Sequence, residues 1–268
     1  MLKGVDVSNW QAGISIRYLD VDFCICKATE GLDFVDVYCN GFVEECKAHG
    51  ILWGFYHFAR ENSPQLETRF FYDNCKGYIG HGIPVLDYEV ENKSNVKWCE
   101  SFIETFHDLS GIWPLLYISA SRCAEYAGSW IPDKCGLWVA GYPQPYIKWT
   151  DDAMPYDIAP FDCAAIWQFT DVLDLDGWNL DGDLAYMDKE GWSAYAKGFR
   201  DAPEHDEDAL PVKPPIASKS CEELADEVLA GKWGNGWNRQ QALDAAYGKG
   251  TYDHVQCIVN MRLGLDGC

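Results

Sequence analysis

The spacing of apolar and polar positions divides the chain into two parts. In residues 1–200, short apolar runs alternate with mixed stretches long enough for helices, which is the pattern of βα units around a parallel sheet. Amphipathic helices are expected over Cys39–His49 and Asn95–Leu109. The runs expected to form strands are Lys3–Val7, Phe23–Ala28, Leu52–His57, Pro84–Val90, Leu115–Ile118, Leu137–Ala140 and Ala164–Phe169.

The character of the sequence changes after residue 200. Asp201–Asp208 carries five acids in eight residues, and the proline-rich run Pro211–Pro215 follows. Because like charges repel and proline favours extended backbone, residues 201–219 are predicted to form a linker. In residues 220–268 the apolar period becomes helical, which predicts a small three-helix module. Its helices are expected to end near Gly231, Gly248 and Gly264.

Charge and composition exclude several classes of partner. The formal charge of −21 argues against nucleic acid, whose binding depends on neutralising phosphates with Lys and Arg. No segment reaches the roughly 18 consecutive apolar residues of a membrane span. The 12 Trp and 15 Tyr suit surfaces that stack on neutral sugar rings, although core packing accounts for most of them.

The N-terminus and the cysteines bear on localisation. The chain begins without the apolar core and cleavage site of a signal peptide, so no Sec export is expected. In a chain of this size without an export signal, the 12 cysteines are expected to be mostly reduced. Neither Cys-x-x-Cys nor His-Glu-x-x-His occurs, and therefore no metal site and no cofactor are predicted.

The chemistry is most concentrated at Ile83–Glu91. Strand residues i and i+2 face the same side, so Asp87 and Glu89 should project together while Tyr88 points away. Paired carboxyls can hydrolyse a glycosidic bond: one donates a proton to the leaving oxygen, and the other, ionised, opposes positive charge at C1. A solvated strand end would give the same short pattern, and Glu91 is a competing acid on the same face.

Two further acidic segments follow predicted strands. Asp6 ends the first strand, and in β/α barrels the carboxyl ends of the strands build the active site. Its alternative role is an Asx turn or a helix cap. Asp174–Asp183 follows the last predicted strand, but its glycine comes too early and no Glu closes the loop, so an EF-hand calcium site is not expected.

Several separate motifs closely resemble, in order and spacing, the family 25 glycoside hydrolases, which are N-acetylmuramidase lysozymes of bacteria, fungi and phages. These motifs are Gly4–Gln11, Lys27–Gly31, Gly54–Phe58, Leu86–Glu89, Leu137–Ala140 and Ile166–Phe169. The resemblance covers about residues 1–190. It implies an incomplete, flattened, TIM-like β/α barrel in residues 1–200 that cleaves the β-1,4 bond between N-acetylmuramic acid and N-acetylglucosamine. The implied partners are peptidoglycan glycan strands and muropeptides.

The resemblance also implies roles for individual residues. Glu89 matches the general acid of the family and Asp87 its partner carboxylate. Asp6 matches the first-strand acid. Asp183 matches the Asp of a final Asp-Leu-Asn motif whose Asn is missing here, with Asp181 as the competitor. Asp87 acts either as a nucleophile or by orienting the substrate's own 2-acetamido group, and the family resembles the second, configuration-retaining case.

Aromatic residues near the strand ends are candidates for a sugar-binding floor, although core packing would explain them as well. They are Tyr56, Tyr117, Trp138, Tyr142 and Trp167. His57 lies between aromatic residues and is expected to be a hydrogen-bonded core histidine. Lys27 and Glu30 are expected to form an ion pair near the mouth of the groove, and the alternative is an ordinary ion pair on the surface.

The C-terminal segment resembles the short CW-type repeat that binds muropeptides in some phage lysozymes and other wall hydrolases. The resemblance rests on Leu224–Gly236, Tyr252–Gln256 and Val259–Asn260. The candidate wall-binding residues are Trp233, Asn235, Trp237 and Arg239. Alternatively, Trp233 fills the core of the small bundle.

Two other functions stay open from the sequence. A Cys/His amidase or peptidase would use a cysteine beside a histidine, and 12 Cys and six His are present. A non-catalytic lectin would share the aromatic residues but would not need acids at three strand ends.

A wall-directed enzyme without Sec export would fit a phage endolysin held in the host cytoplasm until release. A secreted enzyme whose signal has been removed is the alternative, and the oligomeric state cannot be read from the sequence.

Overall fold

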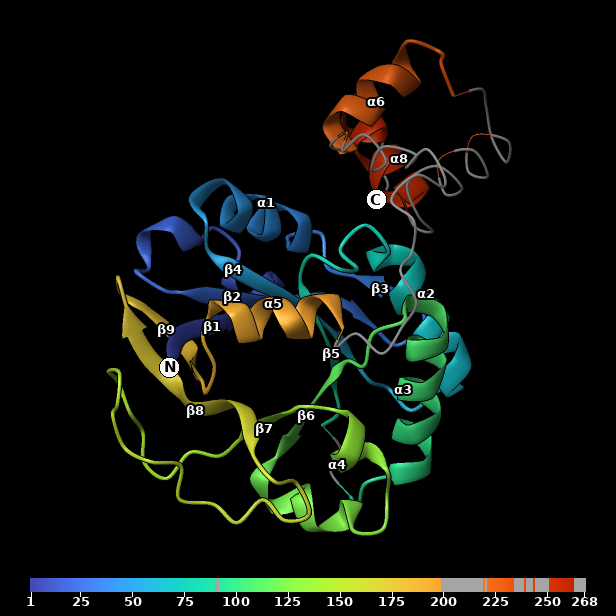
Figure 1. Cartoon of the computed structure of the whole chain (residues 1–268). Coiled ribbons are helices and arrows are strands. Elements are labelled where there is room, and N and C mark those ends of the chain that lie inside the picture. The colour runs from blue at the N-terminus through green and yellow to red at the C-terminus, as the bar shows by residue number, and fades with distance from the viewer. Residues whose placement is uncertain are drawn as a thin grey trace. The chain divides into compact units, whose positions relative to one another are not determined.

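The computed structural model describes residues 1–89, 92–198, 219, 221–233, 239, 243 and 251–262. The chain divides into two compact units, Met1–Pro203 and Glu204–Cys268, which we describe separately (Figure 1). None of the described helices is both long and apolar enough to cross a membrane.

In the first unit, the described residues contain a closed ring of eight strands. In spatial order these are β1 (Leu2–Val7), β2 (Phe23–Glu30), β4 (Leu52–Phe58), β5 (Ile83–Asp87), β6 (Leu115–Ser119), β7 (Leu137–Ala140), β8 (Ala164–Leu175) and β9 (Trp178–Ala185). Pairing is parallel from β1 through β8, whereas β9 runs antiparallel between β8 and β1. The short strand β3 (Phe34–Val35) pairs with the end of β2. The predicted β/α barrel is confirmed.

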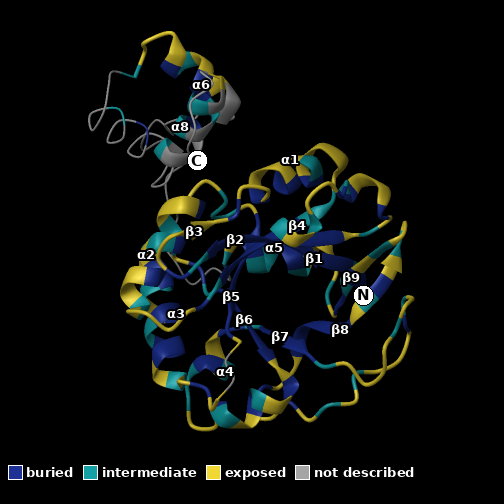
Figure 2. Ribbon diagram, turned by 180° about the vertical axis from the view of Figure 1, so that it is seen from behind, coloured by how far each residue is buried: buried dark blue, intermediate teal, exposed yellow. Residues whose placement is uncertain are grey.

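Helices cover the ring unevenly. They are α1 (Cys39–His49), α2 (Pro64–Cys75), α3 (Val96–Ser110), α4 (Ile131–Lys134) and α5 (Lys189–Lys197), with 3₁₀ segments η1 (Asn9–Gln11), η2 (Ile16–Tyr18) and η3 (Ala120–Tyr126). Helices α1, α2 and α3 lie outside the ring and turn exposed faces to solvent (Figure 2). The connection from β7 to β8 contains no helix in its described residues 141–163, so the helical layer is incomplete.

Side chains alternate along each strand between an outer core under the helices and an inner core inside the ring. Helix α5 crosses one end of the ring (Figure 1) and contributes Trp192 to the inner core. The Trp192 ring packs against Phe23 with centroids 4.7 Å apart, and its indole N–H donates to the carbonyl of Trp53 at 3.3 Å. Because Phe23 and Trp53 lie at the amino ends of their strands, α5 closes that end of the barrel.

The main differences from the predicted elements lie at the ends of two strands. Strand β5 ends at Asp87, so Glu89 lies beyond the regular strand. Strand β8 continues to Leu175 and turns back through Asp176 and Gly177, whose φ angles are 52° and 80°. Left-handed backbone at both central residues favours a tight hairpin. The acidic stretch Asp174–Asp183 is therefore a β-hairpin whose returning strand, β9, was not predicted.

In the second unit, two helices agree with the predicted first and third helices. Helix α6 (Cys221–Leu229) packs on α8 (Thr251–Arg262) through a small core. That core contains Leu224, Ala225, Val228, Leu243, Val255 and Val259. Most of the predicted second helix lies outside the described residues.

Candidate active site

A cleft of about 300 Å³ lies at the carboxyl ends of the strands. Four acids line it: Asp6 from β1, Asp87 and Glu89 at the end of β5, and Asp181 from β9. Because β9 closes the ring beside β1, residues distant in sequence meet here. The cleft lies at the end opposite α5, where β/α barrels carry their active sites.

The end of β5 presents Asp87 and Glu89 to the cleft and Tyr88 to the outer core, as the alternation predicts. The hydroxyl of Tyr88 donates to Glu61 Oε1 at 2.6 Å and accepts from the backbone N–H of Asn95 at 2.8 Å. These two bonds anchor the segment that carries both acids. Glu89 is exposed, whereas Asp87 is only 7% exposed.

Asp87 is electrostatically unusual. Its Oδ1 atom is buried and receives no hydrogen bond from the described residues. Burial raises the pKa of Asp87 well above its usual range, and the nearby carboxylates of Glu89 and Asp6 raise it further, while Lys27 opposes them. Asp87 therefore keeps its proton to a higher pH than an isolated carboxyl.

The acids of β1 and β9 are held differently. The side-chain amide of Gln168 donates to Asp6 Oδ2 at 2.7 Å, and the indole of Trp138 donates to Asp183 Oδ1 at 2.8 Å. Burial raises the pKa of both carboxyls well above the usual range. The negative charge of Asp181 raises the pKa of Asp6 further, and the negative charge of Asp6 does the same for Asp183. Asp6 thus lines the cleft while being held by Gln168, and Asp183 lies fully buried behind the cleft surface.

The structure corrects the expected place of the fourth acid. Asp183 is fully buried and is absent from the cleft lining, whereas Asp181, its competitor, faces the cleft opposite Asp6 in the strand register. Burial, together with the charges of Asp171 and Glu89, raises the pKa of Asp181 to about 6. Asp183 can act on substrate only through its neighbours.

Four of the five predicted aromatic residues line the cleft. Tyr56, Tyr117 and Trp138 form its floor and are at most 8% exposed, whereas Tyr142 at the rim is 42% exposed. The prediction for Trp167 is wrong. Its side chain is fully buried in the outer core, with its indole donating to the carbonyl of Gly141 at 2.9 Å.

Several cleft residues were missed by the sequence reasoning, among them Gln168 and Trp10. Gln168, next to Trp167, faces inward and accepts hydrogen bonds from the hydroxyls of Tyr117, at 2.8 Å, and Tyr142. Trp10 is 83% exposed and lines the cleft. Its turn is fixed by a capping box between Ser8 and Gln11, a signal that the pattern Ser-x-x-Gln already carried.

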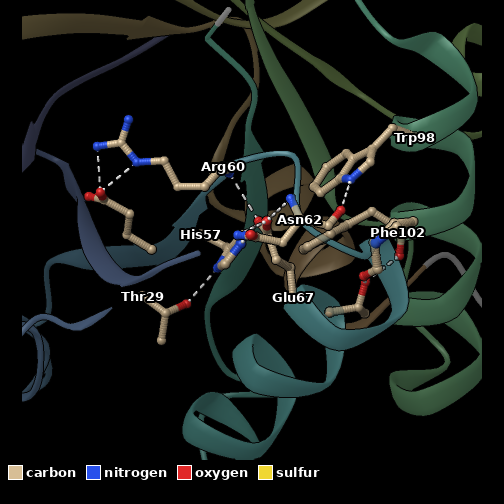
Figure 3. A network of polar contacts seen from close by, with 10 residues as sticks. Thr29, His57, Arg60, Asn62, Glu67, Trp98 and Phe102 are labelled. Atoms are coloured by element: carbon tan, nitrogen blue, oxygen red, sulfur yellow. Dashed lines mark hydrogen bonds and ion pairs between the residues drawn. The ribbon is translucent and has the colours of Figure 1, made fainter. Parts of the chain in front are cut away.

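A polar network is centred on His57 and Glu67 (Figure 3). The His57 ring bonds Thr29 Oγ1 at 2.8 Å through Nδ1 and Glu67 Oε2 at 2.9 Å through Nε2. Glu67 also accepts from the backbone N–H groups of Arg60 at 3.1 Å and Asn62 at 2.6 Å. Burial lowers the pKa of His57. The expected hydrogen-bonded core histidine is confirmed, and it ties β2, β4 and α2 together.

The nine cysteines of residues 1–198 are free thiols, and eight of them are buried. Burial raises the pKa of Cys123 to about 11, which keeps that thiol protonated. A larger cavity of about 760 Å³ is lined by the exposed Cys163 and by His107, but none of the predicted acids lines it. The His107 ring stacks on Trp113 with centroids 3.8 Å apart.

Two of the four candidate residues in the second unit fall within its described part. The indole of Trp233 donates to Glu227 Oε2 at 3.1 Å, and its ring packs, partly buried, against the small core. Arg239 donates to Gln256 Oε1 at 3.0 Å. Asn235 and Trp237 lie outside the described residues.

Comparison with known proteins bears on both units. Residues 222–263 match the CW_7 repeat. An autolytic lysozyme of Clostridium acetobutylicum is 26% identical over 147 residues, 53% of this chain and 45% of the relative. Lysozyme M1 of Streptomyces globisporus is 28% identical over 177 residues, 56% of this chain and 60% of the relative. The chain thus spans about half the length of these relatives.

The fold has a solved counterpart in a family GH25 lysozyme from Aspergillus fumigatus. The TM-score is 0.63 at 23% identity, over 74% of this chain and 99% of that one. Residues 5–178 match the sequence profile of glycosyl hydrolases family 25, which is more than half of the 268 residues. With the barrel and its acid-lined cleft, this match shows that the chain belongs to glycosyl hydrolases family 25.

Proposed function

We propose that this protein is a muramidase, which hydrolyses the β-1,4 bond between N-acetylmuramic acid and N-acetylglucosamine in peptidoglycan. The observation that carries the proposal is the pair at the end of β5. Asp87 is buried and receives no hydrogen bond at Oδ1, while the exposed Glu89 lines the same cleft. Two carboxyls in such different surroundings can take two different roles in glycoside hydrolysis.

In the proposed mechanism, Glu89 donates a proton to the glycosidic oxygen as the bond to C1 breaks. The acetamido carbonyl oxygen of the same sugar attacks C1, and its N–H donates to Asp87. This hydrogen bond favours the ionised form of Asp87, so the proton of the pair is held by Glu89. Water then attacks C1, the bond between C1 and the acetamido oxygen breaks, and Glu89 takes a proton from the water. The configuration at C1 is retained.

The remaining lining residues suit a sugar chain. Trp10 and Tyr142 expose aromatic faces at the rim, where pyranose rings can stack. Gln168 holds the hydroxyls of Tyr117 and Tyr142 and the carboxyl of Asp6 in one network, which preorganises the floor.

Bond type is the direct test. Digestion of purified peptidoglycan should release new reducing ends on muramic acid and no new amino groups from the stem peptides. Reducing ends are counted after borohydride reduction, and Glu89→Gln provides the matched control. New amino groups without reducing ends would refute the muramidase and favour an amidase, and binding without either product would favour a lectin.

For the second unit, we propose that the repeat holds the enzyme on the wall. A weak module tethered to an enzyme can raise its retention on a polymer by about 10² to 10⁴-fold when both sites engage. Truncation after Pro211 should therefore reduce binding and lysis of intact walls, with hydrolysis of short soluble muropeptide glycans unchanged. Equal lysis of walls by the truncated and full-length proteins would refute the targeting role.

A further inference from the structure

Lys27 is a cation in an otherwise acidic cleft. Among the described residues that line the cleft, it is the one Lys or Arg, beside four carboxyls. A β-bulge at Lys27–Thr29 sets its position. In a regular strand, residues three apart face opposite sides, but the extra residue of the bulge lets Lys27 and Glu30 both pair with inward-facing residues of β4, Tyr56 and Phe58.

The surroundings of Lys27 combine one acid with two aromatic rings. Its ammonium lies 2.5 Å from Glu30 Oε2, as predicted, and 5.2 Å and 4.9 Å from the ring centroids of Phe34 and Phe58. Lys27 is only 8% exposed. An ammonium has three N–H donors, and the described residues provide a hydrogen-bond acceptor for one of them, on Glu30. The other donors are available to a ligand.

Lys27 is also a neighbour of the proposed reaction centre. In the strand register, Phe58 of β4 stands beside Asp87 on one side and Glu30 on the other. The charge of Lys27 reaches Asp87, whose pKa it lowers. When a sugar whose acetamido group meets Asp87 is placed with C3 toward β4, the substituent at C3 points toward Lys27 and the two phenyl rings.

The substituent at C3 is what distinguishes the two sugars of peptidoglycan. N-acetylglucosamine has a hydroxyl there, whereas N-acetylmuramic acid has a lactyl ether, which consists of a methyl group and a carboxylate or amide carbonyl. The methyl group matches the two phenyl rings, and the carbonyl oxygen matches the ammonium. We infer that Lys27, Phe34 and Phe58 form a lactyl-binding site that selects N-acetylmuramic acid over N-acetylglucosamine, an inference that rests on the proposed function.

Binding to an inactive enzyme tests this site without turnover. In a Glu89→Gln background, we would measure by calorimetry the Kd of a stripped GlcNAc–MurNAc tetrasaccharide and of chitotetraose, which lacks lactyl groups. Lys27→Met keeps an unbranched side chain but removes the charge. This substitution should raise the Kd of the muramyl ligand about 10- to 100-fold, as expected for the loss of a hydrogen bond to a charged group. The Kd of chitotetraose should change by less than about twofold.

Lys47→Met is the matched control. Lys47 also lies over two aromatic rings, Trp53 at 5.2 Å and Tyr78 at 5.8 Å, and pairs with Glu44 at 2.8 Å, but it lies on α1 away from the cleft. It should change neither Kd. If Lys27→Met lowers the melting temperature measured by circular dichroism, Lys27→Gln replaces it, because the amide can still hydrogen bond to Glu30.

Equal weakening of both ligands by the Lys27 variant would overturn the inference, because Lys27 would then act on a part common to both sugars. No change in either Kd would also overturn it. Failure of the proposed function is recognised separately: a wild-type protein that binds the muramyl ligand selectively but releases no reducing ends refutes hydrolysis and leaves the lactyl site intact.

Discussion

Asp6 and Asp183 on one side of the cleft are held differently from Asp87 and Glu89 on the other side. On the side of β1, β8 and β9, Gln168 donates to Asp6 Oδ2 and Trp138 donates to Asp183 Oδ1, although the buried Oδ2 of Asp183 receives no hydrogen bond from the described residues. On the side of β5, Oδ1 of Asp87 receives no hydrogen bond from the described residues, and Glu89 is exposed. A carboxyl already bonded to protein donors is fixed in place, whereas one without donors can bond to substrate. The acids bonded to protein donors therefore shape the site, whereas the acids of β5 are left to act on the substrate.

The largest effect is expected on the β5 side. Because general-acid catalysis contributes about 10² to 10⁴-fold, Glu89→Gln should lower kcat by that factor while the fold is retained. Asp87→Asn should lower kcat by a similar factor, because the neutral amide cannot replace the ionised carboxylate that accepts the hydrogen bond from the acetamido N–H. Reducing-end release on peptidoglycan measures both variants. Near wild-type turnover of Glu89→Gln would instead point to Glu91.

A smaller effect concerns stability and pH at Asp181. The pKa of Asp181 is raised to about 6 in the folded protein, so folding favours its protonated form. Its contribution to the free energy of unfolding is therefore fully present below the pKa of the unfolded chain and is lost as pH rises through about 6. We expect wild type to lose roughly 1 to 2 kcal/mol of unfolding free energy relative to Asp181→Asn between about pH 4 and pH 7. Urea unfolding at each pH measures this difference, and parallel curves for the two proteins would contradict it.

The smallest effect is expected for Asp183→Asn. The amide oxygen can still accept from Trp138, and a neutral side chain imitates the protonated acid that the raised pKa favours. The loss in kcat/KM should be less than about tenfold. Asp183→Ala, which leaves the Trp138 indole without its acceptor, is the informative companion. If Asp183→Asn lost as much activity as Glu89→Gln, the proposed difference between the acids on the two sides of the cleft would be wrong.

Local patterns in the sequence predicted the parts of this site that depend on local geometry. Alternation placed Asp87 and Glu89 on one face with Tyr88 behind them. It failed at Trp167 because one step along a strand reverses the face, and nothing local showed that Gln168 pointed inward.

Other features depend on contacts between distant segments. Whether Asp181 or Asp183 faces the cleft is decided by the antiparallel pairing of β9 with β1. The bulge that turns Lys27 toward the cleft arises where β2 pairs with β4, and the Lys27–Thr29 sequence alone does not reveal it.

The closing of the ring by β9 has a consequence for the order of folding. Strand β1 is made first, yet one of its two neighbours is the last strand of the barrel, so its edge stays unpaired until residues 178–185 have been synthesised. Only then do Asp6 and Asp181 meet. During translation the chain therefore carries an open sheet edge, which invites association with other chains, and the cleft is completed by the same step that removes this edge.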